Sequence, residues 1–357
     1  MALKFLTVIK IIKINYITKR KLNFFLSSRC SVIVFMENAI KRIQEEACNI
    51  HLYPDGAALQ LRTALAEKHD VNIDQILIGS GGEQIIKLIA HALINEGDEV
   101  IFANPSFGMY EIMSTHIGAK CLSIPLTEDM KHDFKQFKEQ VTSKTKIIYI
   151  CNPNNPTGNI MTKSEVENFL KVIPEDVVVL LDEAYFEYAA MDPDYPNGLE
   201  ILKNRENTII LRTFSKVSGL AGLRVAYCFS NPRMISEMTK IKGVFNANRI
   251  AQYAALASMK DDNHLEETIN LNRKSLEMMM NYFDANDLEY VKSHTNFIFV
   301  NIKKDSRLVN EELLKKGIII RPGFLWGYDD YIRVSTGTLE QTEAFINGLD
   351  DILKLHE

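Results

Sequence analysis

The sequence predicts an α/β protein whose mostly parallel sheet lies between layers of helices. From about residue 38 onward, short apolar runs alternate with segments of helical pattern, as strands and helices alternate in such folds. Several runs are β-branched or aromatic throughout, which is typical of strands buried on both faces. The 357 residues exceed the roughly 250–300 at which single cores stop growing, so we expect two domains.

The larger domain, which we place at residues 51–269, is expected to contain the central sheet. Residues 59–69 and 83–95 have apolar side chains at spacings of three and four, the pattern of helices with one buried face. The expected strands are the apolar runs at 76–78, 100–102, 147–150, 177–181, 209–211 and 225–229. Because these runs do not alternate with polar residues, helices are expected on both faces of the sheet.

A smaller α+β domain is expected from residues 37–50 and 270–357. Leading into and through this part of the chain, helical stretches are expected at 233–242, 249–259 and 265–284. Strand-like runs follow at 297–300, 318–320 and 332–334, and a last helix is expected at 340–355. No Gly- or Ser-rich linker separates the two domains. We therefore expect the long helix near 265–285 to join them.

The composition points to a small-molecule ligand in a reducing compartment. A formal charge of −5 argues against a nucleic acid or an anionic membrane as partner, and the apolar stretch at 5–12 is far shorter than the ~20 residues of a spanning helix. The five cysteines include no Cys-x-x-Cys pair, which favours free thiols and the cytoplasm. The eight histidines lack metal-ligand spacing, so no metal is expected.

Chemically active residue types stand just after the predicted strands, where ligands bind in open α/β sheets. The Gly-rich turn at 79–83 precedes a helix and suits either a phosphate or a plain tight turn. Asp182 follows a fully apolar strand, so its carboxylate is expected to have a cationic partner. Lys216 lies in the loop after the next strand, where a lone lysine is ordinarily a solvated side chain.

Taken together, these residues stand in the order found in fold-type-I pyridoxal 5'-phosphate (PLP) enzymes, and the chain resembles the histidinol-phosphate aminotransferase branch of that superfamily. The resemblance runs from about residue 37 to the C-terminus. The matching motifs are Tyr-Pro-Asp-Gly at 53–56, Asn-Pro-Ser-Phe-Gly-Met-Tyr at 104–110, Asn-Asn-Pro-Thr-Gly at 154–158, Asp-Glu-Ala-Tyr at 182–185, Arg-Thr-Phe-Ser-Lys at 212–216, Gly-Leu-Arg at 222–224 and Ile-Arg-Val-Ser-Thr-Gly-Thr at 332–338. The resemblance implies a larger domain that binds PLP.

The resemblance also implies roles around the cofactor ring. Lys216 would hold PLP covalently and, once released by the substrate amine, act as the catalytic base. Asp182 would face the pyridine nitrogen and keep it protonated. Asn155 and Tyr185 would donate to the phenolic oxygen. Phe107 would stack on the ring, unless it is an ordinary core aromatic.

Further residues would bind anionic groups. The groups implied for the cofactor phosphate are the amides of Gly81 and Gly82, the side chains of Ser215 and Arg224, and Tyr53 reaching in from a second subunit. A homodimer is therefore expected. Arg333 would bind a carboxylate of glutamate through two parallel hydrogen bonds, whereas Arg321 would face a second anionic group such as a substrate phosphate, or form a surface ion pair.

The activity implied is amino transfer between L-glutamate or 2-oxoglutarate and L-histidinol phosphate or imidazole acetol phosphate, in histidine biosynthesis. An aromatic amino acid aminotransferase is one alternative, because one pocket can admit similar rings. A PLP-dependent lyase resembling threonine-phosphate decarboxylase is another, and it would align a different Cα bond perpendicular to the ring. A non-catalytic regulator would need a DNA-binding module, for which residues 1–36 are too short.

Residues 1–36 depart from the pattern of this branch. They contain seven Lys or Arg and no Asp or Glu, so the net −5 combines +7 here with −12 in the remainder. Branch members usually carry Asn-Glu-Asn-Pro after a Leu-Ser-Ser, but here Leu26-Ser27-Ser28 is followed by Arg29 to Met36. This departure has three alternative explanations, namely a shifted reading frame, a targeting segment or a genuine divergent arm. We expect residues 1–36 to form a poorly ordered arm and the chain to have weak activity. Cofactor binding and dimer formation are expected to survive deletion of the arm.

Overall fold

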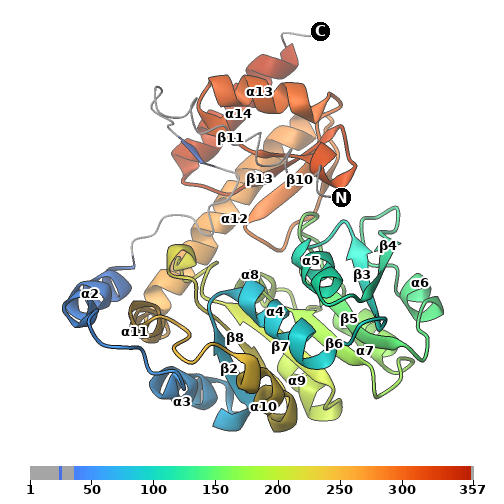
Figure 1. The fold of residues 1–357 in the computed structure, drawn as a ribbon. Coiled ribbons are helices and arrows are strands. Elements are labelled where there is room, and N and C mark those ends of the chain that lie inside the picture. The colour runs from blue at the N-terminus through green and yellow to red at the C-terminus, as the bar shows by residue number, and fades with distance from the viewer. Residues whose placement is uncertain (1–23, 26–35, 355–357) are drawn as a thin grey trace.

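The computed structural model describes residues 24–25 and 36–354. Figure 1 shows a lower unit built around a seven-stranded sheet and an upper unit built around a four-stranded sheet. The long helix α12 (Asp262–Ala285) connects them, where the sequence pattern placed a joining helix. The predicted α/β class is confirmed. Within the described residues, no helix has both the length and the hydropathy needed to cross a bilayer.

The strands of the seven-stranded sheet lie in the order β2-β8-β7-β6-β5-β3-β4. They are β2 (Ile76–Gly79), β3 (Glu99–Asn104), β4 (Lys120–Pro125), β5 (Thr145–Cys151), β6 (Val178–Asp182), β7 (Thr208–Thr213) and β8 (Ala226–Phe229). All neighbouring pairs are parallel except those of β8, which is antiparallel to both β2 and β7. Because β8 and its neighbours are buried at every position, the sequence pattern carries no sign of strand direction.

Helices cover both faces of this sheet. They are α3 (Leu59–His69), α4 (Gly82–Leu93), α5 (Met109–His116), α6 (Phe134–Glu139), α7 (Lys163–Leu170), α8 (Phe186–Ala189), α9 (Gly198–Asn204), α10 (Pro232–Ile241) and α11 (Arg249–Ser258). Successive strand residues point to opposite faces, so Ile209 joins a core with α4 and α10 whereas Ile210 joins one with α3 and α11. The candidate site therefore rests on a sheet that is covered from both sides.

Helix α2 (Glu37–Glu46) belongs with the lower unit rather than with the smaller domain (Figure 1). It packs against α11, and Ala39 lies fully buried in the same core as Leu61 of α3. Glu46 also forms an ion pair with Arg249 of α11 at 2.8 Å. These contacts correct the expected place of residues 37–50, because the buried face of α2 completes the core of the larger unit.

The upper unit contains the antiparallel sheet β12-β13-β10-β9. Its elements are β9 (Tyr290–Val291), β10 (Phe297–Asn301), α13 (Ser306–Lys315), β11 (Ile318–Ile319), β12 (Arg321–Pro322), β13 (Tyr331–Ser335) and α14 (Leu339–Lys354). Met279 of α12 and Phe345 of α14 share one core with Ile298 of β10, so the α+β character is confirmed.

The predicted strand at 318–320 corresponds to β11 at Ile318–Ile319, and a second short strand, β12, follows at Arg321–Pro322. Strand β11 pairs in parallel with β1 (Phe24–Phe25), whereas β12 pairs with β13.

Met36 is buried in the core of the lower unit. The other residues of the predicted arm, 1–23 and 26–35, lie outside the described residues.

Candidate active site

The loops that carry the predicted site residues leave one edge of the large sheet. Strands β5, β6 and β7 are parallel neighbours, with Cys151 opposite Asp182 and Asp182 opposite Leu211 near their carboxyl ends. Strand β2 runs in the same direction, because both β2 and β7 are antiparallel to β8. The loops after β2, β5, β6 and β7 therefore meet at one edge, where ligands bind in sheets of this kind.

Asp182 is the last residue of β6, and its carboxylate is buried. The Tyr110 hydroxyl donates to Oδ2 at 2.7 Å, and the Ala184 amide donates to Oδ1 at 3.1 Å. Burial raises the pKa of the Asp182 carboxyl, while these two donors and the charge of Lys216 act in the opposite direction. A buried carboxylate held in this way suits a protonated ring nitrogen, whose charge would offset the cost of its desolvation.

Lys216 and Tyr185 lie beside this carboxylate. The Lys216 Nζ is 4.8 Å from the centroid of the Tyr185 ring, and its positive charge acts on Asp182. Tyr185 is buried, and its ring meets Phe297 of the upper unit edge-on at 5.3 Å. The structure thus brings an amine, a carboxylate and a phenol together where the two units meet.

Gly81 and Arg224 form a cradle for an anion at the N-terminus of α4. Gly81 precedes the helix with φ of +83°, and a Cβ at this position would lie 2.5 Å from the Arg224 guanidinium. Its amide donates to the Gly79 carbonyl at 2.9 Å, so the segment is a tight turn as well. A helix N-terminus next to a guanidinium suits a phosphate. Ser215, in the loop after β7, is also buried. Its backbone amide donates to the Thr213 hydroxyl at 3.0 Å.

Asn155 and Arg333 connect the two units across the site. The Arg333 guanidinium donates to Oδ1 of Asn155. Because a guanidinium has no acceptor, this contact turns the NH₂ group of Asn155 away from Arg333 and leaves it to donate elsewhere. The guanidinium carbon of Arg333 lies 4.7 Å from the Phe297 centroid and 5.4 Å from the Trp326 ring, so two aromatic rings hold the charge in place.

Phe107, Arg321 and Tyr53 have different surroundings. Phe107 packs on the core of the sheet, and its ring contacts Tyr110 edge-on at 5.7 Å. Arg321 is exposed and stands opposite Arg333 in the β12–β13 pair, so both side chains leave the same face of that sheet. Tyr53 is 77 % exposed and stacks on Phe245 at 4.2 Å. Tyr53 is therefore a surface residue of the single chain.

Tyr110 and Trp326 are absent from the sequence-based prediction of the site. Tyr110 is fully buried and stacks on Tyr149 at 4.7 Å, and burial raises the pKa of its hydroxyl well above the usual value. Tyr110 lies in the first turn of α5, two residues after its N-cap Gly108, and it belongs to the same motif as Phe107, which is the sequence signal that could have indicated it. Trp326 ends a short 3₁₀ segment (Gly323–Trp326), which has no periodicity to indicate where its side chain points.

A buried ion pair lies next to Asp182. Arg212 donates to Oε2 of Glu183 from Nε at 2.9 Å and from Nη2 at 2.8 Å. Its guanidinium carbon lies 3.4 Å from the Phe186 centroid, and the Gly198 amide donates to Oε1 of Glu183 at 2.7 Å. Arg212 thereby offsets part of the charge of Glu183, which raises the pKa of the neighbouring Asp182.

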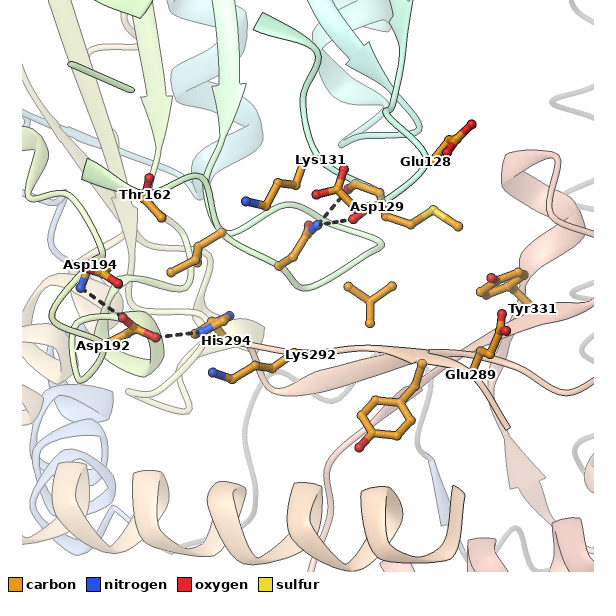
Figure 2. Close-up of a pocket in the computed structure, with 15 residues that line it drawn as sticks. Glu128, Asp129, Lys131, Thr162, Asp192, Asp194, Glu289, Lys292, His294 and Tyr331 are labelled. Atoms are coloured by element: carbon orange, nitrogen blue, oxygen red, sulfur yellow. Dashed lines mark hydrogen bonds and ion pairs between the residues drawn. The ribbon is translucent and has the colours of Figure 1, made fainter. Parts of the chain in front are cut away.

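A cavity of about 610 Å³ lies between the two units (Figure 2). It is lined by residues 128–131, 159, 160, 162, 192 and 194 of the lower unit and by residues 289–292, 294 and 331 of the upper unit. Figure 2 shows Asp192 facing His294. Oδ2 of Asp192 lies 3.1 Å from Nε2 of His294. None of the predicted site residues lines this cavity, so the candidate site is defined by the strand-edge cluster around Asp182 and Lys216.

The sequence model of the family described as aminotransferase class I and II matches residues 24–349. The chain is 41 % identical over 317 residues to the histidinol-phosphate aminotransferases of Moorella thermoacetica and Caldicellulosiruptor saccharolyticus. These matches cover 88 % and 89 % of this chain, and 82 % and 88 % of the two relatives.

Solved structures with the same fold include the histidinol-phosphate aminotransferase from Sinorhizobium meliloti in complex with pyridoxal-5'-phosphate. The similarity has a TM-score of 0.90 at 26 % identity and covers 96 % of this chain and 94 % of that one. The L-threonine-O-3-phosphate decarboxylase from Porphyromonas gingivalis has a TM-score of 0.81 at 23 % identity, over 92 % of this chain and 99 % of that chain. The second likeness is one of fold alone.

Proposed function

Because this chain belongs to the class I and II aminotransferases, we propose that it is a PLP-dependent enzyme that moves an amino group between L-glutamate and imidazole acetol phosphate, and so forms L-histidinol phosphate and 2-oxoglutarate in histidine biosynthesis. The observation that carries the proposal is 41 % identity, over most of both chains, to two histidinol-phosphate aminotransferases. The buried Asp182 beside Lys216 and the Gly81–Arg224 cradle fit the cofactor's ring nitrogen, aldehyde and phosphate.

When bound, PLP supplies an aldehyde that accepts the amino group and a ring that takes up the electron pair left by the Cα proton. Asp182 would hold a proton on the ring nitrogen, since a buried carboxylate stabilises a positive charge beside it. The Lys216 amine would remove the Cα proton and return it at the neighbouring cofactor carbon. Asn155 would donate to the phenolic oxygen through the NH₂ group that Arg333 leaves available.

Two arginines would let one site accept two different substrates. Arg333 would bind a glutamate carboxylate through two parallel hydrogen bonds. Histidinol phosphate has no carboxylate but carries a phosphate, and Arg321 stands opposite Arg333 on the same sheet face. We assign the substrate phosphate to Arg321 for this reason.

We also propose that the active form is a cytoplasmic homodimer. Tyr53 and Phe245 stack on one another while 77 % and 48 % exposed, and Ile50 and Val244 beside them in sequence are 71 % and 75 % exposed. A second copy of the chain would cover these side chains and would bring Tyr53 to the neighbouring site. Cys48, Cys121, Cys151 and Cys228 are free thiols, which is consistent with a reducing compartment.

Substrate profiling at equal enzyme concentration tests this function. The expected result is a higher kcat/KM for histidinol phosphate than for phenylalanine or tyrosine, with 2-oxoglutarate as amino acceptor. A higher value for an aromatic amino acid would assign the chain to aromatic aminotransferases. Release of CO₂ without a keto-acid product would assign it to lyases.

A further inference from the structure

The loop after β5 contains two buried asparagines whose side chains bind different parts of the chain. Asn152 and Asn154 are 3 % and 2 % exposed. Asn152 donates to the Met161 carbonyl and accepts from the Met161 amide, both at 2.9 Å. Its amide group therefore fixes the far end of its own loop, away from the other strand ends.

Asn154 instead connects this loop to the one after β3. The Ser106 hydroxyl donates to Oδ1 of Asn154 at 2.8 Å. The Nδ2 group donates to the Pro105 carbonyl at 3.2 Å and to the Thr157 hydroxyl at 2.9 Å. Both amide protons and the amide oxygen are thus engaged, and two of the three contacts reach a segment 48 or 49 residues away in sequence.

The residues on either side of this connection are the proposed cofactor contacts. Phe107 follows Ser106 directly, and Asn155 follows Asn154. The loop is closed by backbone hydrogen bonds from the Asn154 amide to the Asn159 carbonyl at 3.0 Å and from the Gly158 amide to the Asn154 carbonyl at 2.7 Å. Asn155 therefore has little freedom to move unless the Asn154 side chain releases the β3 loop.

We propose that Asn154 is a positioning residue that fixes the donor Asn155 relative to the ring-stacking Phe107, and so sets how strongly the cofactor's phenolic oxygen is stabilised. This inference rests on the proposed function, because it takes Asn155 as the oxygen's donor. Asn154 itself does not touch the cofactor in this assignment. It acts through the geometry of two loops that its side chain holds together.

The visible absorbance of the purified holoenzyme, titrated with pH, tests the proposal. A donor to the phenolic oxygen favours its anion, so Asn155→Ala should raise the pH midpoint of the colour change. Asn154→Ala should raise the midpoint in the same direction by at least half as much, and the double variant should show no further shift. The dissociation constant for PLP should rise about tenfold in Asn154→Ala, as expected for loss of a hydrogen-bonded position.

Asn152→Ala is the matched control, since it removes an equally buried amide from the same loop. It should lower the melting temperature as Asn154→Ala does, but leave the pH midpoint at the wild-type value. Ser106→Ala removes only one of the three contacts of Asn154. Ser106→Ala should raise the pH midpoint by less than Asn154→Ala does. It also provides a test of the proposal if Asn154→Ala does not fold.

The outcomes separate this inference from the proposed function. A wild-type protein that stays colourless with added PLP overturns both. A coloured wild type whose midpoint moves in Asn155→Ala but not in Asn154→Ala or Ser106→Ala overturns the positioning role alone. An equal shift in Asn152→Ala also overturns it, because the loop as a whole would then be responsible.

Discussion

The Tyr110 hydroxyl donates a hydrogen bond of 2.7 Å to Oδ2 of Asp182, and both side chains are buried. Tyr110 belongs to α5 and Asp182 ends β6, so the orientation of the carboxylate is set by a helix 72 residues away in sequence. The Ala184 amide holds the other oxygen. Both oxygens are therefore fixed before any ligand arrives, which limits the reorganisation that accompanies a charge change at this site.

Tyr110→Phe should slow the enzyme while the cofactor stays bound. The substitution keeps the ring that packs on Tyr149 but removes the donor to Asp182, and a hydrogen bond to a charged group contributes about 1.5–3 kcal/mol. We expect kcat to fall about 10- to 100-fold in steady-state kinetics. Tyr149→Phe is the control, because it loses only a 3.1 Å contact with Ser114. An equal loss in both variants would show that ring packing, and not the bond to Asp182, is responsible.

Gly81→Ala should weaken cofactor binding, whereas Gly82→Ala should not. At Gly81 a methyl group would lie 2.5 Å from the Arg224 guanidinium, and φ of +83° with ψ of 165° is a glycine conformation that costs other residues about 1–3 kcal/mol. At Gly82 the nearest atom is a Leu211 methyl at 3.5 Å, an ordinary contact. Equilibrium titration with PLP measures the two dissociation constants. Equal values would place the phosphate elsewhere.

Lys216→Ala should lose both the yellow colour of the covalently held cofactor and nearly all turnover. Lys216 supplies the only amine assigned to the cofactor aldehyde, and the same amine is the assigned base. Absorbance spectra and coupled assays on the purified protein measure the two properties. A variant that keeps the covalent absorbance would show that a different lysine holds PLP.

Hybrid dimers should show whether Tyr53 serves the neighbouring site. Mixing Tyr53→Phe protein with Lys216→Ala protein would create one site free of both changes if Tyr53 acts across the two-fold axis. We expect partial recovery of activity in verified hybrids, given that Tyr53→Phe alone is impaired. Absence of recovery would place Tyr53 in the site of its own subunit.

Acid should destabilise the protein through His132. This side chain is buried, and burial lowers its pKa from 6.5 to about 4, so the folded state binds fewer protons than the unfolded state below pH 6.5. Stability is therefore lost as the pH falls from about 6.5 towards 4, by about 3 kcal/mol at most.

His132→Phe should reduce this loss, which denaturant titrations at pH 7 and pH 5 can measure. Burial dominates at His132, although the nearby Asn154 side chain acts in the opposite direction on its pKa, and the ring stacks on Phe137 at 5.8 Å. An aromatic replacement keeps this stacking, and the Asn154 side chain retains its bonds to Ser106, Pro105 and Thr157. An unchanged difference between the two pH values would assign the acid sensitivity to another group.

Two elements of the larger unit match their predicted bounds closely. Residues 59–69 match α3 in both bounds, and the run 177–181 matches β6 within one residue. Helix α5 is missing from the prediction because its eight residues, Met109–His116, are fewer than the roughly 11–18 over which a helical period can be recognised. The direction of β8 could not be predicted from its sequence, because strands that are buried at every position have the same apolar pattern whichever way they run.

The predicted site residues on the sheet edge come together because each lies at the carboxyl end of a strand or in the loop after it. Strand order and polarity then determine which loops meet, as for Asp182 and Lys216. Contacts that depend on side-chain direction are not encoded in such patterns. Tyr110 and Asn154 reach across 72 and 48 residues to their partners, and only the folded arrangement reveals those pairs.

The contact of Arg333 with Trp326 gives the protein an optical reporter of its own. The sequence contains one tryptophan, and that indole lies 5.4 Å from the guanidinium assigned to the substrate carboxylate. All tryptophan emission of the protein therefore originates beside this arginine. Ligand-induced changes at Arg333 can be followed by fluorescence in the unmodified chain, without a label and without waiting for turnover.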